Sequence, residues 1–284
     1  MRDTAEWLRT AILVAAATAA AAASAAPPAP AAPQVIPLSF ASKLPKVRVE
    51  MGDATVMVRL DSGAYASGIS LAEKDFGPAH VMVTGTTHWK DARGNELQGR
   101  TFVVPELRVG ALTVRDVPGT ELVFAPDAPP ADRDGVLGFA FLRNYIVAID
   151  FGSAQVRVYP ADSSRPPEEC AQGRAPLSIV PAGLASTIGT EFGRMRVGWA
   201  TGATGNMLTA QSMKIDVDAD PYGRQVRLRN VSLGPVHIPQ LSAQVVDLRI
   251  PGLDGVLGAD FFASHHVCLD VKHRSVSVTE TSGR

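Results

Sequence analysis

The sequence predicts an all-β protein made of two similar lobes. Val, Leu, Gly and Pro are abundant, short alternating apolar segments recur throughout, and long helical periodicity is scarce. Blocks of sequence also repeat in the same order in the two halves of the chain. With 284 residues, 46% of them hydrophobic, the chain can bury one large core or two modest ones.

The first strands are expected as a hairpin near the start of the first lobe. Residues 47–51 and 56–60 each alternate between apolar and polar side chains, and a Gly-Asp turn lies between them. Helical segments are few: a short helix is expected at 71–74, and one after each of the two Gly-Val-Leu-Gly sequences. The predicted arrangement is a pair of β half-barrels.

The internal repeat is the most informative feature of the sequence. Asp-Gly-Val-Leu-Gly at 134–138 recurs at 254–258, and each copy is followed by aromatic residues and an apolar strand. Four blocks match in order: 58–64 with 197–203, 69–70 with 208–209, 109–114 with 233–238, and 134–138 with 254–258. Ordered matches of this kind are improbable by chance, so we interpret the chain as two diverged copies of one unit.

The repeat and the composition also predict where the parts of the chain begin and end. Residues 160–175 are rich in Pro, Ser and charged side chains, as boundaries between domains usually are. The expected parts are a signal peptide at 1–25, a Pro/Ala-rich linker at 26–41, a first lobe at 42–160, a linker at 161–176, and a second, degenerate lobe at 177–284.

Residues 1–25 have the layout of a secretory signal peptide. Arg2 and Arg9 precede an Ala-rich apolar run, which ends in an Ala-Ser-Ala cleavage site at 23–25. An uncleaved membrane anchor is the alternative, but the run is short and weakly hydrophobic for a membrane span. We therefore expect a periplasmic or secreted protein with no membrane association beyond this peptide.

Charge and residue types exclude several functions. The 27 Lys and Arg residues balance 28 Asp and Glu residues, and no basic stripe suggests nucleic-acid binding. The six His residues are scattered, and neighbouring His265 and His266 should point to opposite faces of a strand, so neither a metal nor another cofactor is expected. Cys170 and Cys268 could pair in an oxidising compartment, or Cys268 could be a buried free thiol; the sequence leaves both open.

Asp61, Ser62 and Gly63 form a candidate functional turn directly after an apolar strand. Gly63 permits a close approach that a side chain would block. The Ser62 hydroxyl can hydrogen-bond to the backbone of a facing loop, which would leave Asp61 projecting between the two halves. Taken alone, Asp-Ser-Gly is also an ordinary turn sequence.

The context of this turn adds a resemblance. With Asp61 to Ala64 after an apolar residue, and Val136, Leu137 and Gly138 about seventy residues later, the sequence resembles the aspartic-protease superfamily, particularly bacterial retropepsin-like proteins. The resemblance covers 42–160 well and 177–278 in degenerate form. It implies two pepsin-like or retropepsin-like half-barrel lobes with a cleft between them, and no cofactor.

The resemblance also implies roles for the residues of the turn. Asp61 would be the catalytic carboxylate of a peptidase, and the residues that support its turn would be Ser62, Gly63, Ala64, Val136, Leu137 and Gly138. Hydrolysis of a peptide or protein substrate in this superfamily uses two carboxylates that share one proton. One partner activates water, and the other donates a proton to the substrate.

The second copy lacks its carboxylate. Ala200 stands where the repeat aligns with Asp61, although Thr201 and Gly202 keep the framework of the turn. One alternative is a homodimer in which Asp61 pairs with the same residue of a second molecule. The other is an inactive pseudoprotease that binds peptide or protein, with its two copies paired in one chain, as the tandem arrangement favours. The sequence thus predicts an exported aspartic endopeptidase, with the pseudoprotease as the alternative.

The first copy has extra residues where the superfamily has its flap, a hairpin over the cleft. Residues 86–96 contain a Gly-Asn turn, and Trp89 could lie over a bound peptide. A surface hairpin with a partly buried Trp is the alternative. Copy two has a shorter counterpart at 218–223.

Overall fold

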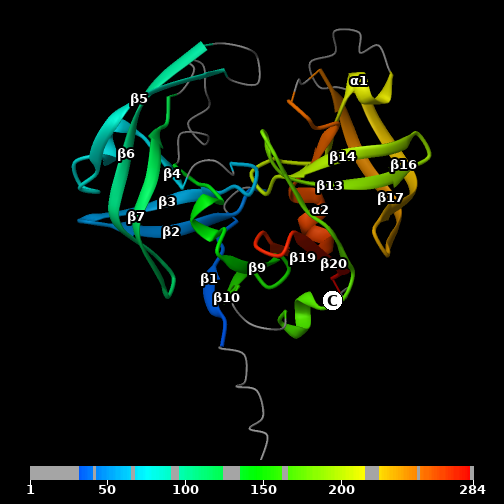
Figure 1. Cartoon of the computed structure of the whole chain (residues 1–284), viewed down its shortest axis with the longest axis horizontal. Coiled ribbons are helices and arrows are strands. Elements are labelled where there is room, and N and C mark those ends of the chain that lie inside the picture. Colours follow the sequence, from blue (N-terminus) through cyan, green and yellow to red (C-terminus); the bar gives the residue numbers. More distant parts are fainter. Residues whose placement is uncertain are drawn as a thin grey trace, which may run out of the picture.

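The computed structural model describes residues 32–40, 43–64, 68–90, 96–123, 135–161, 166–214, 224–247 and 250–281. These ranges form three β-sheets and a few short helices, which confirms the prediction of an all-β fold (Figure 1). Within them, no helix has the length and apolar character needed to cross a membrane. The predicted signal peptide at 1–25 lies outside the described residues.

The first lobe is a seven-stranded sheet, drawn in blue to green on the left of Figure 1. Its order is β2 (Lys46–Met51), β3 (Ala54–Leu60), β8 (Val136–Leu137), β4 (Ile69–Leu71), β7 (Leu112–Glu121), β6 (Glu96–Val109) and β5 (Met82–Lys90). An additional pairing of β2 with β6 curls the sheet round on itself. The predicted first hairpin is confirmed, because β2 and β3 pair antiparallel across the turn at Gly52, whose φ is +52°.

The second lobe is a sheet of the same kind, in yellow to orange on the right of Figure 1. Its order is β12 (Ser178–Val180), β13 (Gly183–Thr190), β14 (Gly193–Trp199), β18 (Gly255–Leu257), β15 (Met207–Thr209), β17 (Val236–Val246) and β16 (Arg224–Leu233). The matched sequence blocks occupy the same places in both sheets. In each lobe a short central strand, β8 or β18, runs parallel to the second hairpin strand and antiparallel to its other neighbour.

A third sheet joins the two lobes at the bottom of Figure 1. Its order is β1 (Gln34–Pro37), β10 (Gln155–Pro160), β9 (Tyr145–Asp150), β19 (His265–Asp270), β20 (Ser275–Glu280) and β11 (Arg174–Pro176). β9 from the first lobe and β19 from the second pair antiparallel, with Ile149 opposite Val267. The lobes therefore share one continuous sheet.

Each of the two segments expected as linkers contributes a strand to this shared sheet. Gln34–Pro37, inside the expected linker at 26–41, pairs with β10 and buries Ile36. Arg174–Pro176, inside the expected linker at 161–176, pairs with β20. A strand of three or four residues shows too little alternation of apolar and polar side chains to be recognised from sequence, especially beside prolines. The strands that these two segments pair with also lie about 100 residues or more later in the chain.

The helices are short, as the sequence predicted. Among the described residues they are the 3₁₀ turns η1 (Glu73–Asp75), η3 (Ala140–Leu142) and η4 (Glu168–Cys170) and the α-helices α1 (Ala210–Met213) and α2 (Ala259–Ser264). η3 and α2 follow the two Gly-Val-Leu-Gly sequences, and η1 overlaps the helix expected at 71–74. α1 was not predicted; it is capped by Thr209, whose side chain accepts a hydrogen bond from the backbone N–H of Ser212 at 3.2 Å.

An aromatic cluster fills the space where the second lobe meets the shared sheet. Trp199 is fully buried, and its ring centroid lies 5.7 Å from that of Phe261 and 6.2 Å from that of Phe262. Phe151, just after β9, stacks on Phe262 at 5.5 Å. The Trp199 indole N–H donates to the Ser186 hydroxyl at 3.1 Å, so its polar group is satisfied in the core. The first lobe thus contributes an aromatic ring to packing in the second lobe.

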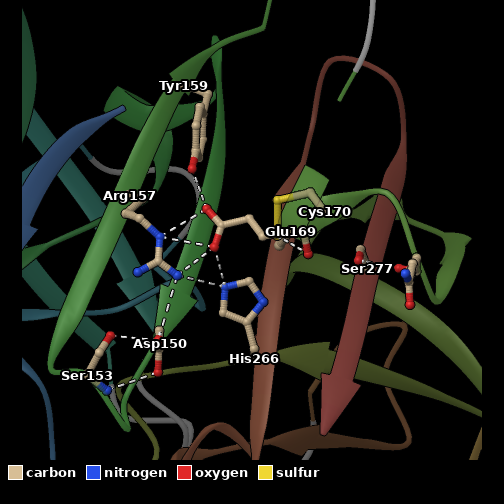
Figure 2. A network of polar contacts seen from close by, with 10 residues as sticks. Asp150, Ser153, Arg157, Tyr159, Glu169, Cys170, His266 and Ser277 are labelled. Atoms are coloured by element: carbon tan, nitrogen blue, oxygen red, sulfur yellow. Dashed lines mark hydrogen bonds and ion pairs between the residues drawn. A yellow bond between two sulfur atoms is a disulfide. The ribbon is translucent and has the colours of Figure 1, made fainter. Parts of the chain in front are cut away.

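A polar network ties the lobes together around Glu169 (Figure 2). Arg157 on β10 donates from Nε to the Glu169 carboxylate at 2.9 Å, and the Tyr159 hydroxyl donates to the same carboxylate. His266 on β19 places Nε2 3.1 Å from Oε2 of Glu169. Neighbouring His265 is instead buried and stacked on Phe261, as strand alternation predicts. One carboxylate therefore connects the first lobe, the connecting segment and the second lobe.

The environment of Glu169 changes the ionisation of two groups. Burial opposes the charged form of Glu169, but hydrogen bonds from His266, Arg157 and Tyr159 outweigh it and hold the pKa of this carboxyl well below its ordinary value. Burial, together with the hydrogen bond to Glu169, raises the pKa of Tyr159 to about 12. The carboxylate and the neutral phenol are thus the stable forms at neutral pH.

Cys170 and Cys268 form a disulfide beside this network, with Cα atoms 5.6 Å apart. Of the two alternatives that the sequence left open, the structure has the paired one. The bridge spans a sequence separation of 98 residues. By the loop-entropy model, a cross-link over about 100 residues stabilises the folded chain by about 4–5 kcal/mol.

We expect Glu169→Gln to destabilise the protein in a pH-dependent way. Because the folded pKa of Glu169 is depressed, its contribution is present above the unfolded value of about 4.3 and is lost as pH falls below it. Wild type should exceed the variant in unfolding free energy by about 1.5–3 kcal/mol near neutral pH. Urea titrations should show this gap narrowing at about pH 3; a gap that does not change with pH would contradict the assignment.

Candidate active site

The Asp61 turn lies at the end of β3. The neighbouring strand β8 and the residues after it hold this region through backbone hydrogen bonds. The backbone N–H of Asp61 donates to the carbonyl of Leu137 at 3.0 Å, and the N–H of Gly138 donates to the carbonyl of Gly68 at 2.9 Å. Ala64 accepts from the N–H of Phe139 at 3.1 Å. The Leu137 carbonyl and the Phe139 N–H therefore bond the backbone at the two ends of the segment Asp61 to Ala64.

The second turn is built in the same way at the end of β14. The N–H of Ala200 donates to the carbonyl of Leu257 at 3.0 Å, and the N–H of Ala259 donates to that of Ala203 at 2.8 Å. One contact was not expected from the sequence: the buried Asn206 side chain accepts from the N–H of Gly258 at 3.0 Å. Asn is common in turns, so its sequence position gave no sign of this role.

Four buried hydrogen bonds clamp the two turns together, and we call them the Ser62–Thr201 clamp. The N–H of Ser62 donates to Oγ1 of Thr201 at 3.0 Å, and the N–H of Thr201 donates to Oγ of Ser62 at 3.0 Å. Each hydroxyl then donates across to the opposite strand, Ser62 to the Trp199 carbonyl and Thr201 to the Leu60 carbonyl, both at 2.8 Å. The clamp is reciprocal, so the turns of the two lobes pair within one chain.

The clamp positions the Asp61 carboxylate between the two turns. Its Oδ1 accepts from the N–H of Gly63 at 2.8 Å and from the N–H of Gly202 at 3.2 Å. A Cβ added at Gly202 would lie 2.3 Å from the Asp61 carboxyl carbon, so only glycine fits there. Asp61 is partly exposed, and its second oxygen, Oδ2, accepts no hydrogen bond from a described residue.

Ala200 faces the first turn where a second carboxylate would be needed. A Cβ built at Gly63 would lie 3.1 Å from the Ala200 methyl and 3.1 Å from Oδ1 of Asp61. The Ala200 methyl packs with Ala185 and Leu253 in a small buried cluster. Among the described residues, no other carboxyl group hydrogen-bonds to Asp61.

The predicted flap is a hairpin in the structure, although its tip is not described. β5 and β6 pair antiparallel out to Lys90 opposite Glu96, whereas residues 91–95 lie outside the described ranges. Trp89 pairs with Leu97 through the backbone, and its side chain lies outside the described part. Its position over a ligand therefore stays a prediction, as does the role of the counterpart at 218–223, which is not described.

No group of three or more His, Cys, Asp or Glu side chains in the described ranges is arranged to hold a metal ion.

Solved structures with the same architecture are found at low sequence identity, whereas no protein-family model and no curated protein matches the sequence. An aspartic proteinase from Irpex lacteus has a TM-score of 0.62 and 13% identity, covering 88% of this chain and 98% of its own. Basic 7S globulin from soybean has a TM-score of 0.60 and 11% identity, covering 88% of this chain and 95% of its own.

The chain has the pepsin-like aspartic-protease fold. Both lobes and the shared sheet belong to it, because the matches extend over 88% of the chain. At 13% and 11% identity the likeness establishes the fold and leaves activity to be argued from the site. One of the two proteins is described as a proteinase and the other as a globulin.

We expect Thr201→Val to destabilise this pepsin-like fold more than Thr201→Ser does. Valine has the shape of threonine but leaves the Ser62 N–H and the Leu60 carbonyl buried without partners. The loss should be about 2–4 kcal/mol, whereas serine keeps the hydroxyl and should cost about 1 kcal/mol. Urea unfolding followed by Trp fluorescence measures both; equal stability of the two variants would show that the clamp contributes little.

Proposed function

We propose that this chain is a pseudoprotease that binds an extended peptide segment between its lobes, with Asp61 as a fixed hydrogen-bonding group. One observation carries the proposal: the Ser62–Thr201 clamp joins the two turns of a single chain, and the residue that faces Asp61 across them is Ala200. The turn architecture is retained, but a methyl group stands in place of the second carboxylate.

Peptide hydrolysis by this fold depends on two carboxylates with opposite protonation states. One withdraws a proton from water while the other donates a proton to the carbonyl oxygen and later to the leaving amine. A single carboxylate can fill only one of these roles at a time, and a methyl group can fill neither. Asp61 can still hydrogen-bond to a hydroxyl or amide of a bound ligand through Oδ2, which accepts no hydrogen bond from a described residue.

Pairing Asp61 with the same residue of a second molecule conflicts with the clamp. Such a dimer would place two copies of the first turn face to face, as the second turn now faces the first. The Ser62 hydroxyl already accepts from Thr201 and donates to Trp199. A symmetric dimer through this turn would have to break all four buried hydrogen bonds, at about 1 kcal/mol or more each. We therefore propose that the clamp within the chain prevails.

The second candidate function is an aspartic endopeptidase with Asp61 as its catalytic carboxylate. The observation that favours it is the intact first turn, in which Oδ1 accepts two backbone N–H donors and glycine is kept at both close approaches. This candidate needs a second proton-transfer group from the substrate or from water.

We also propose that the chain is exported and that its two lobes are diverged copies. The disulfide between Cys170 and Cys268 supports export, because disulfides persist in oxidising compartments. The signal-peptide pattern of residues 1–25 points the same way. The matched order of strands in the two seven-stranded sheets supports the duplication.

Ala200→Asp should convert the protein into a measurable peptidase. By the pseudosymmetry of the turns, the new carboxyl would face Gly63 as Asp61 faces Gly202. We expect hydrolysis of a denatured protein substrate at acidic pH to rise about 10²–10⁴-fold above that of wild type. Ala200→Asn is the control of equal size, and Asp61→Ala in the Ala200→Asp background should remove the gain. Wild-type hydrolysis that is abolished by Asp61→Ala would instead establish the endopeptidase.

Binding of a peptide analogue that carries a hydroxyl in place of the attacked carbonyl should depend on Asp61. Asp61→Ala removes a charge-assisted hydrogen bond and should weaken binding by about 10- to 100-fold. Ser153→Ala is the control, since Ser153 lies beside Asp150 near the shared sheet, away from the clamp. Calorimetry with both variants measures the effect, and equal affinities of wild type and Asp61→Ala would refute a role for Asp61 in binding.

A further inference from the structure

The second lobe carries a pocket whose residues belong neither to the Ser62–Thr201 clamp nor to the Asp61 turn. It has a volume of about 940 Å³ and lies between the β13–β14 hairpin, the end of β15 with α1, and residues 250–254. Three cationic side chains line it, from Arg194, Arg196 and Lys214. We call it the cationic pocket.

The cations of this pocket are not neutralised within the described part of the chain. None of the three side chains makes an ion pair or hydrogen bond to a described residue, whereas Arg100 and Arg157 in the same molecule are held by carboxylates. Asp254 is the one carboxylate among the described residues that line the pocket, and its Oδ2 accepts a hydrogen bond from the backbone N–H of Arg196 at 2.8 Å. The described residues that line the pocket therefore carry more positive than negative charge.

The two arginines are held side by side by strand geometry. Arg194 and Arg196 are exposed on one face of β14, and Met195 between them is buried on the other. Residues two apart on a strand lie about 7 Å from each other, so the guanidinium groups share one region of space. Like charges this close favour an anion between them, and a carboxylate suits the fork of donors on each arginine.

Apolar residues of the pocket wall pack towards the Ala200 turn, and Thr187, Thr209, Gln211 and Ser212 add polar groups to the wall. Leu253 belongs to the buried cluster that contains Ala200, and Ile250 is partly buried and packs against that cluster. A Cβ added at Gly198, two residues before Ala200, would lie 2.8 Å from Leu253. A volume of 940 Å³ exceeds what one small anion fills and is within the range of sites for larger ligands.

We propose that the cationic pocket binds an acidic side chain, with its apolar neighbours, of the peptide held between the lobes. This inference rests on the proposed function and deepens it by naming the ligand class: peptides that carry Glu or Asp on the side that leads past Ala200 over the second lobe. Arg194 and Arg196 bind the carboxylate, Lys214 adds a third positive charge, and Ile250 and Leu253 contact the apolar part of the segment.

The test compares two pools of random dodecapeptides that are identical except that Glu in one pool is replaced by Gln in the other. Binding to the full-length mature protein is measured by fluorescence polarisation. We expect the Glu pool to bind about 10-fold or more tightly than the Gln pool at low salt, and the ratio to fall towards one at high salt, where exposed charges are screened. Arg194→Gln with Arg196→Gln should abolish the preference, so that the two pools bind the variant with equal affinity.

The matched control is Arg224→Gln with Arg227→Gln, which removes two exposed arginines from β16 outside the cationic pocket. The control should keep the preference for Glu; losing it would show that net charge alone is responsible and overturn the proposal. Equal binding of both pools to wild type would overturn the proposed role of the cationic pocket but not peptide binding itself. If neither pool binds, the proposed function is overturned as well. If inorganic phosphate binds at the two arginines while the two pools bind equally, the pocket is a site for a free anion. That result would overturn the proposal that it binds an acidic side chain of a peptide.

Discussion

The reciprocal hydrogen bonds between Ser62 and Thr201 determine where every other part of the site lies. Each hydroxyl accepts a hydrogen bond from one backbone N–H and donates one to a backbone carbonyl. Both hydroxyls and all four backbone groups therefore have protein partners. Asp61 and Ala200, which directly precede Ser62 and Thr201, take no part in the hydrogen bonds of the clamp. That independence explains how Asp61 and Ala200 can occupy equivalent positions: replacing one carboxylate by a methyl group leaves the scaffold and its buried polar contacts unchanged.

Much of the site could be predicted because its signals are local and repeated. The repeat aligned Asp61 with Ala200 and placed the Val-Leu-Gly segments under them, and the structure has both arrangements. Other features depend on partners far away in sequence. Gln34–Pro37 and Arg174–Pro176 were expected in linkers, since strands so short acquire their identity from the sheet they join. Asn206 acts through a backbone N–H that no sequence pattern marks.

The shared sheet and the Glu169 network make the two lobes one mechanical unit. β9 and β19 pair directly, Phe151 stacks on Phe262, and Glu169 accepts hydrogen bonds from both sides (Figure 2). Two lobes joined only by a flexible linker would change their separation freely. Here the relative position of the two lobes is fixed at the clamp and again at the shared sheet, which would lower the entropy cost of binding the proposed peptide ligand.

The disulfide has a topological consequence for the second lobe. Cys170 and Cys268 are 98 residues apart, and almost all of the second lobe lies between them in the chain. Residues 170–268 therefore form a covalent ring, which the disulfide to Cys268 on β19 closes. A single backbone cut anywhere in the ring opens it without releasing a fragment, so the strands on both sides of the cut remain attached and near their partners. A protein exposed to foreign proteases could in this way be nicked in its second lobe and still keep Thr201 within reach of Ser62.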